Sequence, residues 1–309
     1  MTVPTRPEDQ PSPGSAVRPP VVDAHVHAFP NEVIVSRDAL VHRDHWFGEL
    51  YVNPAAKLTN ADDLLASMDL AGIDHSVIGG FPWSDPGRCR AHNDWMAEVC
   101  AASRDRLSWL GIVVPQHAGA DREAERCFEL GAVGIGELNA DGQGFDLGDV
   151  AAIDSVIETC VAAQRPMLLH STEPVGHDYP GKGGATPDRL LRFLAAYPDL
   201  DVVLAHWGGG LPFYELMPEV AATCRRVRYD TAASPYLYRH DILGVVSALV
   251  GPERILWGSD FPVLGQQRFL RRTRATPLPV DDLDLILGGT ARSVYRLPIP
   301  DHPLEGRAT

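Results

Sequence analysis

Short apolar runs rich in β-branched residues alternate with longer amphipathic segments from residue 21 onward. The runs cover residues 21–27, 75–80, 107–114, 132–138, 166–170, 202–207, 227–232 and 255–260. Their length and composition are typical of strands buried on both faces. The segments between them predict helices over 61–72, 90–103, 121–131, 149–164, 186–198, 212–224, 239–251 and 281–295. Several of these segments begin at Asp or Thr and end at Gly or before Pro, as capped helices do.

Eight strands alternating with eight helices predict a single α/β domain, a (β/α)₈ TIM barrel over residues 21–309. An open doubly wound sheet is less favoured, because no G-x-G-x-x-G motif follows the first strand. Residues 1–20 contain six prolines and almost no large apolar side chain. Such a segment cannot bury enough surface to offset its ordering entropy, so we expect a disordered tail there.

Charge and hydropathy limit the classes of partner that the protein is expected to bind. The formal net charge of −14 disfavours nucleic acid and anionic membranes, because both need a concentrated basic face. The sequence has no signal-peptide pattern and no apolar stretch of about 18 residues, so we expect a cytoplasmic protein. Its five cysteines lack C-x-x-C spacing, which predicts reduced thiols rather than disulfides or a cysteine zinc site. The expected partner is a small-molecule substrate, and self-association into a homo-oligomer stays open.

Ionisable side chains lie at the carboxyl ends of most of the predicted strands. His25 and His27 are two residues apart, so on a strand both imidazoles point to the same side. The later strands end at Glu137, His170, His206, Asp230 and Asp260. In a barrel these carboxyl ends converge on one mouth. A ring of such groups would be costly to bury unpaired, so a divalent cation is the natural partner.

Together with the strand-end histidines, the motifs HWGGG at 206–210 and GSDFP at 258–262 resemble the amidohydrolase superfamily. Within it the chain is similar to the amidohydrolase-related group, which includes aminocarboxymuconate-semialdehyde decarboxylase-like enzymes. The resemblance covers residues 21–295. It implies a metal, usually zinc, with His206 beside it as a polarising or acid/base residue. The metal ligands that it implies are His25, His27, His170 and Asp260.

Glu137 departs from this pattern. Decarboxylase-like members typically lack a glutamate here, whereas some hydrolytic members similar to the TatD-type deoxyribonucleases carry one in a related strand. Glu137 is therefore a further candidate ligand and catalytic residue. No lysine closes this strand, so a binuclear centre built on a carbamylated lysine is not expected. We expect about one ion per chain, and a metal content near two would indicate that Glu137 bridges a second ion.

The ligand types suit Zn²⁺, with Mn²⁺ or Fe²⁺ as alternatives. We predict a hydrolase that cleaves an amide, lactam, lactone or ester through a metal-activated water. Asp260 would carry the proton and His206 would polarise the carbonyl. The alternative is a non-oxidative decarboxylase, in which Asp260 or His206 delivers a proton to carbon. A metal-binding protein without catalytic activity is the least favoured hypothesis, because acid/base residues accompany the ligands.

Two long loops are expected to shape substrate choice. Residues 28–59 either fold over the mouth as a lid or pack their own aromatic side chains. The loop after His170 contains GKGGAT, which lacks P-loop spacing and is not expected to bind a nucleotide. Each candidate substrate contact has an ordinary structural or solvated role as its alternative. These candidates are Trp83, Glu173, His177, Lys182 and Tyr236.

Overall fold

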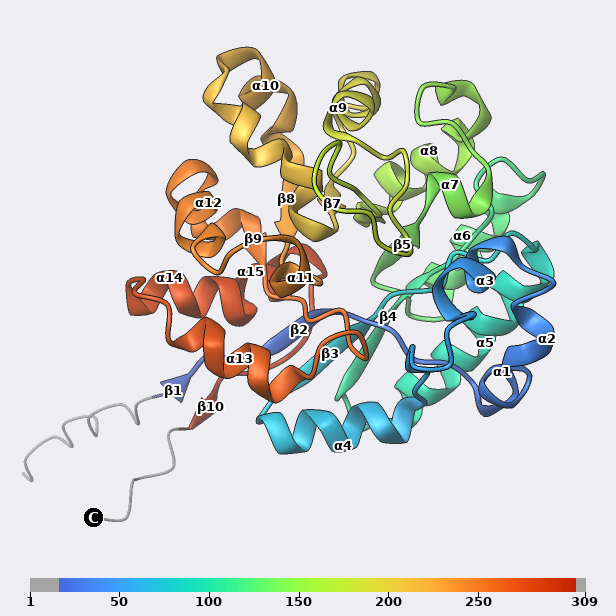
Figure 1. Cartoon of the computed structure of the whole chain (residues 1–309), viewed down its shortest axis with the longest axis horizontal. Coiled ribbons are helices and arrows are strands. Elements are labelled where there is room, and N and C mark those ends of the chain that lie inside the picture. The colour runs from blue at the N-terminus through green and yellow to red at the C-terminus, as the bar shows by residue number, and fades with distance from the viewer. Residues whose placement is uncertain (1–16, 304–309) are drawn as a thin grey trace, which may run out of the picture.

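The computed structural model describes residues 17–303 and contains the predicted barrel (Figure 1). Eight parallel strands follow one another in chain order around the sheet. They are β2 (Val22–Val26), β3 (His75–Ile78), β4 (Leu107–Gly111), β5 (Gly134–Leu138), β6 (Met167–Leu169), β7 (Val202–Leu204), β8 (Val227–Asp230) and β9 (Ile255–Leu256). All eight strands lie within the predicted ranges, so the fold prediction is confirmed.

The barrel closes where the segment from β9 onward meets β2. Ala24 N donates to Trp257 O at 2.8 Å, and His27 N donates to Phe261 O at 2.7 Å. Between them Asp260 N donates to His25 O at 2.9 Å. Backbone hydrogen bonds of the closing seam therefore fix residues from opposite ends of the sequence side by side.

Successive strand residues serve two cores, because their side chains point to opposite faces of the sheet. In β6, Leu168 packs with Val203 and Val22 inside the barrel. Its neighbours Met167 and Leu169 belong to the larger cluster shared with the helices. The near-continuous apolar runs of the sequence follow from this burial on both faces.

Helices cover the outside of the barrel (Figure 1). The longer ones are α4 (Ala61–Ala71), α5 (Pro86–Ala102), α6 (Ala120–Glu129), α8 (Asp154–Ala163), α9 (Pro187–Ala196), α12 (Ile242–Val250) and α13 (Gln266–Arg274). Shorter ones are α1 (Asn31–Val35), α2 (Arg37–Leu40), α3 (His45–Tyr51), α7 (Ala140–Gln143), α10 (Pro218–Thr223), α11 (Ser234–Leu237), α14 (Val280–Asp284) and α15 (Thr290–Val294). None of the helices within residues 17–303 is both long and apolar enough to cross a membrane.

Capping residues determine where the helices begin and end, as α4 shows. At α4, the Asn60 side chain accepts from Asp63 N at 2.9 Å and the Asp63 side chain returns the contact, which forms a capping box. The helix ends at Gly72, whose φ of 70° is left-handed. All five cysteines are free, as their spacing predicted.

Three helical segments differ from the prediction. The helix expected over 212–224 is reduced to α10. The preceding segment, η2 (His206–Leu216), consists of irregular turns, and its residues 207–210 have positive φ. The helix expected over 281–295 is interrupted by a π-helical turn, η5 (Leu285–Gly289). Gly288 passes so close to Pro20 O that an added Cβ would lie 1.9 Å away. Helix α13 was missed, because its charged sequence shows only a narrow apolar stripe around Phe269. Short helical turns complete the loops at η1 (Val150–Ala152), η3 (Cys224–Arg226) and η4 (Pro252–Arg254).

The last residues of the predicted tail are ordered. Strand β1 (Val17–Arg18) pairs antiparallel with β10 (His302–Pro303). The Arg18 guanidinium binds Asp74 with contacts of 2.6 and 2.8 Å, and Asp74 also accepts from Val21 N. These contacts hold residues 17–20 against the barrel, in contrast to the prediction for that stretch. The rest of the predicted tail, residues 1–16, lies outside the described residues.

Asp23 on β2 is the side chain that ties the two ends of the barrel together. It is fully buried and accepts hydrogen bonds from Ser259 N at 2.8 Å, Ser259 Oγ at 2.6 Å and Gln266 Nε2 at 2.9 Å. Burial raises the pKa of Asp23 to about 6, although the hydrogen bonds from Ser259 and Gln266 oppose the rise.

We predict that Asp23→Ala lowers the free energy of unfolding by about 3 kcal/mol or more. It leaves several buried donors unpaired, and each unpaired donor costs roughly 1–3 kcal/mol. Denaturant unfolding of the metal-free protein measures the loss. Glu98→Ala, on the exposed side of α5, is the control and should shift stability by no more than about 0.5 kcal/mol. Equal unfolding midpoints for the two variants would contradict the role given to Asp23.

Candidate metal centre

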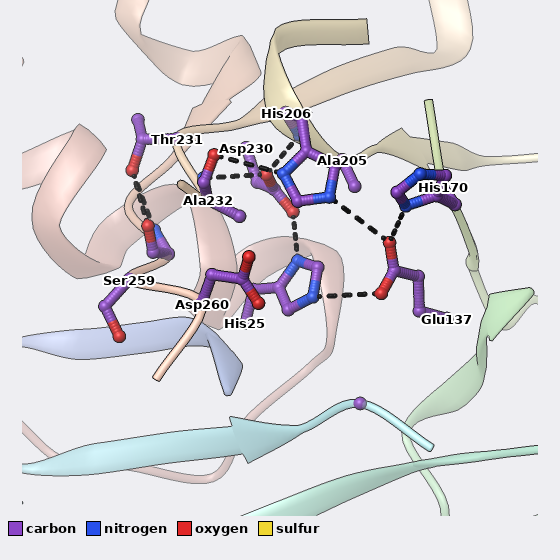
Figure 2. Close-up of polar contacts among 12 residues, drawn as sticks. His25, Glu137, His170, Ala205, His206, Asp230, Thr231, Ala232, Ser259 and Asp260 are labelled. Atoms are coloured by element: carbon purple, nitrogen blue, oxygen red, sulfur yellow. Dashed lines mark hydrogen bonds and ion pairs between the residues drawn. The ribbon is translucent and has the colours of Figure 1, made fainter. Parts of the chain in front are cut away.

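The ionisable residues at the strand ends converge at the carboxyl end of the barrel (Figure 2). His25 lies in β2, with His27 just beyond it, and Glu137 lies in β5. His170, His206 and Asp260 follow β6, β7 and β9. Together with apolar side chains, five of these groups line a cavity of about 270 Å³, and His25 lies buried behind them. The structure thus brings together every residue predicted as a metal ligand, as well as His206.

The first half of the centre is formed by the two histidines of the β2 end with two carboxylates. His25 Nε2 and His27 Nε2 are 3.2 Å apart, and each is 3.4 Å from Glu137 Oε2. His27 Nε2 is also 3.5 Å from Asp260 Oδ1. Zinc-to-ligand bonds of about 2.0–2.1 Å in a tetrahedron place neighbouring ligand atoms roughly 3.3 Å apart. These spacings therefore match the edges of one coordination sphere.

The outward nitrogens of these two imidazoles are held by acceptors. His25 Nδ1 lies 2.7 Å from Asp230 Oδ2, and His27 Nδ1 lies 3.2 Å from Gly79 O. Because a carbonyl or carboxylate oxygen can only accept, each Nδ1 carries a proton and donates it. In the neutral ring the inward Nε2 then carries a lone pair instead of a proton, which is the form that binds a metal.

The second half of the centre is formed by His170 and His206 around the other oxygen of Glu137. His170 donates from Nε2 to Gly181 O at 3.1 Å, and its Nδ1 faces Glu137 Oε1 at 2.8 Å. His206 donates from Nδ1 to Ala232 O at 3.1 Å, and its Nε2 is 3.5 Å from Glu137 Oε1. In their neutral form these rings also turn a lone pair inward.

Lone pairs and carboxylates that converge on a buried point repel one another unless a positive charge lies between them. In the metal-free protein, protons can supply it. Burial alone would lower the pKa of His25, but the charges of Asp230 and Glu137 outweigh it and raise this pKa well above its usual value. The same balance at His206, with Glu137 and Asp260 as the acids, raises its pKa to about 9. A divalent cation fits this donor set and would displace those protons.

The candidate ligand atoms fall into two groups, whereas the sequence predicted one set. His25, His27 and Asp260 form one group, and Glu137, His170 and His206 form the other, each with its atoms within 4.8 Å of one another. His170 was expected beside the histidines of the first strand. Its inward nitrogen instead lies nearest to Glu137, because its other nitrogen is fixed by the backbone of the following loop.

Asp230 is the important residue to which the sequence assigned no role. It is buried at the end of β8, where Oδ1 accepts from His206 N at 2.9 Å and from Ala232 N at 3.0 Å. Its Oδ2 holds His25 in the metal-binding tautomer. Its place in the ring of strand-end carboxylates was a signal that could have indicated this supporting role.

Two of the five predicted substrate contacts, His177 and Tyr236, line the cavity. The other three are not among its lining residues. Trp83 is 1 % exposed, packs on Phe47 and Phe81 behind the wall, and donates to His92. Glu173 accepts from Tyr179 at 2.9 Å. Lys182 donates to backbone carbonyls, among them His177 O at 3.0 Å, and so closes its own loop.

The long segment after β2 forms part of the cavity wall. Helix α3 begins after Asp44, whose side chain accepts from Phe47 N, and places Trp46, Leu50 and Tyr51 against the cavity. Trp46 meets the ring of His170 edge-on, with ring centroids 6.0 Å apart. Phe47 points away from the cavity into the aromatic core. The segment therefore lines the cavity with some of its side chains and packs other aromatic side chains into the core.

A (β/α)₈ barrel with histidines and carboxylates at its strand ends defines a class of metal-site proteins. Within that class, the amidohydrolase family model matches residues 22–297, so the chain belongs to the amidohydrolase family. The family resemblance seen in the sequence is confirmed.

Two relatives found by comparison of sequences are decarboxylases. Gamma-resorcylate decarboxylase of Rhizobium radiobacter is 26 % identical over 250 residues, covering 67 % of this chain and 76 % of the relative. The 6-methylsalicylic acid decarboxylase of Penicillium expansum is 24 % identical, covering 89 % of this chain and 95 % of the relative.

A solved structure has the same fold. It is 5-carboxyvanillate decarboxylase of Novosphingobium aromaticivorans, complexed with manganese and 4-hydroxy-3-methoxy-5-nitrobenzoic acid. The TM-score is 0.73 at 20 % identity, covering 93 % of this chain and 100 % of that one.

We predict that Asp230→Asn weakens divalent-metal affinity by roughly 10- to 100-fold, the usual effect of losing such a support. The amide oxygen can still accept from the backbone of His206 and Ala232, so the fold should persist. The amide NH₂ would face His25 Nδ1 and force the proton of that ring onto the inward nitrogen. Calorimetric Mn²⁺ titration measures the affinity, and the melting temperature of the metal-free variant checks the fold. Unchanged affinity would show that Asp230 does not set the tautomer of His25.

Proposed function

We propose that the protein is a metal-dependent, non-oxidative decarboxylase of a small aromatic acid. The observation that supports this proposal is a cavity lined both by the histidines and carboxylates of the metal centre and by aromatic side chains. Among the described residues that line it, none is a lysine or arginine. Within this lining, the cationic place for a substrate carboxylate is therefore the metal centre. The decarboxylase relatives support this choice over the hydrolysis predicted first.

The walls suit a flat ring that carries few charges. Trp46, Tyr51, Phe81, Tyr236 and Leu237 are among the residues that line the cavity. Aromatic side chains bind a flat ring through dispersion and edge or face contacts. A substrate with a second carboxylate remote from the centre would meet no cation there. We therefore assign a monocarboxylic aromatic acid as the substrate class.

A bound divalent ion supplies the positive charge that holds the substrate carboxylate and an adjacent oxygen. The chain must then deliver a proton to the ring carbon that bears the carboxylate. As the carbon–carbon bond breaks, its electron pair returns to the ring and carbon dioxide leaves. One proton is consumed for each carboxylate lost, and it has to be replaced from water.

We assign the proton delivery to Asp260. Within the described part of the chain its carboxylate has one polar contact, His27 Nε2 at 3.5 Å, so an oxygen is available to a proton. It also lines the cavity, where a substrate ring would lie. His206 is less suited, because its Nδ1 proton is held by Ala232 O and its Nε2 faces Glu137. The polarising role predicted for His206 is compatible with this arrangement.

Isotopic labelling tests the reaction class. We expect 2,6-dihydroxybenzoate or 6-methylsalicylate, incubated in D₂O with Mn²⁺-loaded protein, to release one CO₂ per turnover. The aromatic product should carry deuterium at the carbon that lost the carboxylate. Esters and lactones of similar size, incubated in H₂¹⁸O, should take up no ¹⁸O. Uptake of ¹⁸O into a carboxylate product, without CO₂ release from aromatic acids, would favour the hydrolase instead.

Asp260→Asn separates the proton carrier from the ligand. The amide keeps an oxygen for the metal but cannot carry the proton, so kcat should fall by about 10² or more while bound metal changes little. Stopped assays of CO₂ together with metal analysis measure both quantities. The matched control is Asp199→Asn, on an exposed turn before β7, at the far end of the barrel. Near-normal turnover in Asp260→Asn would reassign proton transfer to His206.

A further inference from the structure

We propose that Asn139 determines which aromatic acids the cavity prefers, by donating a hydrogen bond from its side-chain amide to an oxygen on the substrate ring. This oxygen belongs to a ring substituent that lies outside the metal centre. The inference rests on the proposed function, because it narrows the substrate class of the same cavity.

Asn139 lies in the cavity wall beyond the metal centre. It directly follows β5 and lines the cavity, although it is only 1 % exposed. Its backbone is extended, with φ of −128° and ψ of 114°, and residues two apart on an extended chain point to the same side. Leu138 packs outward against the helices, so Glu137 and Asn139 both face the cavity.

The cap of α7 fixes which end of the Asn139 amide faces the cavity. Asn139 Oδ1 accepts from Gly142 N at 2.8 Å. A flipped amide would place its NH₂ group against that N–H, and neither of these groups can accept a hydrogen bond. Nδ2 therefore points away from the helix, and among the described residues it has no hydrogen-bond partner.

The position of Asn139 is held by Gln143. Asn139 N donates to Gln143 Oε1 at 3.2 Å, and Gln143 N donates to Asn139 O at 2.9 Å. Gln143 is itself fixed, because its Nε2 donates to Val113 O at 2.6 Å and to Trp83 O at 3.3 Å. The amide cannot turn to another partner without breaking these contacts. A donor that is fixed in this way loses little conformational entropy when a ligand binds.

Trp46 brings a flat ring beside this amide. It packs directly on α7, since an added Cβ at Gly142 would lie 2.7 Å from Trp46 Cγ. Trp46 and Asn139 both line the cavity. An aromatic acid that packs on the indole therefore has one edge next to the donor.

A buried NH₂ group favours a ligand that offers it an acceptor. A ring oxygen at Nδ2 can replace the hydrogen bond that water would make there, whereas a hydrogen or a methyl group at the same place cannot. Tyr179, another polar residue of the wall, already donates its hydroxyl to Glu173. The preferred substrates are therefore acids that carry a further hydroxyl or ether oxygen on the ring.

Binding of hydroxylated benzoates to the full chain tests this contact. Salicylate is the reference, and the probes are 2,3-, 2,4-, 2,5- and 2,6-dihydroxybenzoate. Calorimetry with the Mn²⁺-loaded protein measures the affinity, and KM measures it where CO₂ is released. At least one isomer should bind roughly three- to tenfold more tightly than salicylate, the range for one neutral hydrogen bond. Equal or weaker binding of all four isomers would overturn the proposal.

Asn139→Ser removes the amide and keeps an oxygen that can cap α7. The preferred isomer should lose its gain in affinity, while the affinity for salicylate and kcat should change little. An equal loss for salicylate and for the preferred isomer would indicate a structural role and would contradict the proposal.

Asn53→Ser is the matched control. Asn53 is exposed and is not among the residues that line the cavity, but its Oδ1 also accepts a backbone N–H, from Ala55 at 3.0 Å. This variant should keep the full gain of the preferred isomer.

Asn139→Ala removes any substitute contact that a serine hydroxyl could make. The melting temperature of the metal-free variant checks that it folds without the cap, and Asn139→Ser remains the test if it does not. Persistence of the gain in either folded variant would overturn the role of Asn139.

These outcomes are separate from those of the proposed reaction. A gain in affinity that depends on Asn139, without CO₂ release, would overturn the decarboxylase alone. CO₂ release with no gain from a second hydroxyl would overturn the role of Asn139 alone.

Discussion

The convergence of lone pairs at the mouth of the barrel is the constraint on which the site depends. Each imidazole donates its outer N–H to an acceptor outside the centre, Asp230 or a backbone carbonyl, so that in the neutral ring an unprotonated nitrogen faces inward. Such an arrangement is repulsive in a buried cavity unless a cation occupies it. The carbonyls and Asp230 that set these tautomers are therefore as important to metal binding as the ligands themselves.

The closing seam of the barrel serves the same centre. Asp23 holds Ser259 and Gln266 against β2, and the next residue of the seam, Asp260, donates its backbone N–H to His25 O. Asp260 has a φ of 61°, in the left-handed region, which is strained for a non-glycine residue and persists only when the surroundings fix it. The fold thus places one candidate ligand from the end of the chain beside two candidate ligands from its beginning.

The fold and most of the centre could be predicted because they depend on local patterns. Strand periodicity and the alternation with capped helices were sufficient to define the barrel, and strand-end positions were sufficient to indicate the ring of candidate ligands. The division of the ligands into two groups was not predictable, since it depends on which nitrogen of His170 the backbone at Gly181 holds. The sequence indicated residues 28–59 as a lid or a self-packed loop, but which side chains of α3 face the cavity depends on how that helix packs. Trp83 and Lys182 were misplaced because sequence shows their chemistry but not the direction in which they point.

Anomalous diffraction from crystals of the Mn²⁺-loaded protein tests the central claim most directly, that the inward nitrogens hold a cation. The account predicts an anomalous peak bonded to His25 Nε2 and His27 Nε2, with Asp230 still hydrogen bonded to His25 Nδ1. Bond lengths should be near 2.1 Å, within the range of metal–imidazole bonds. A loaded crystal with no anomalous peak between these nitrogens, or with His25 turned so that Nδ1 faces inward, would contradict it.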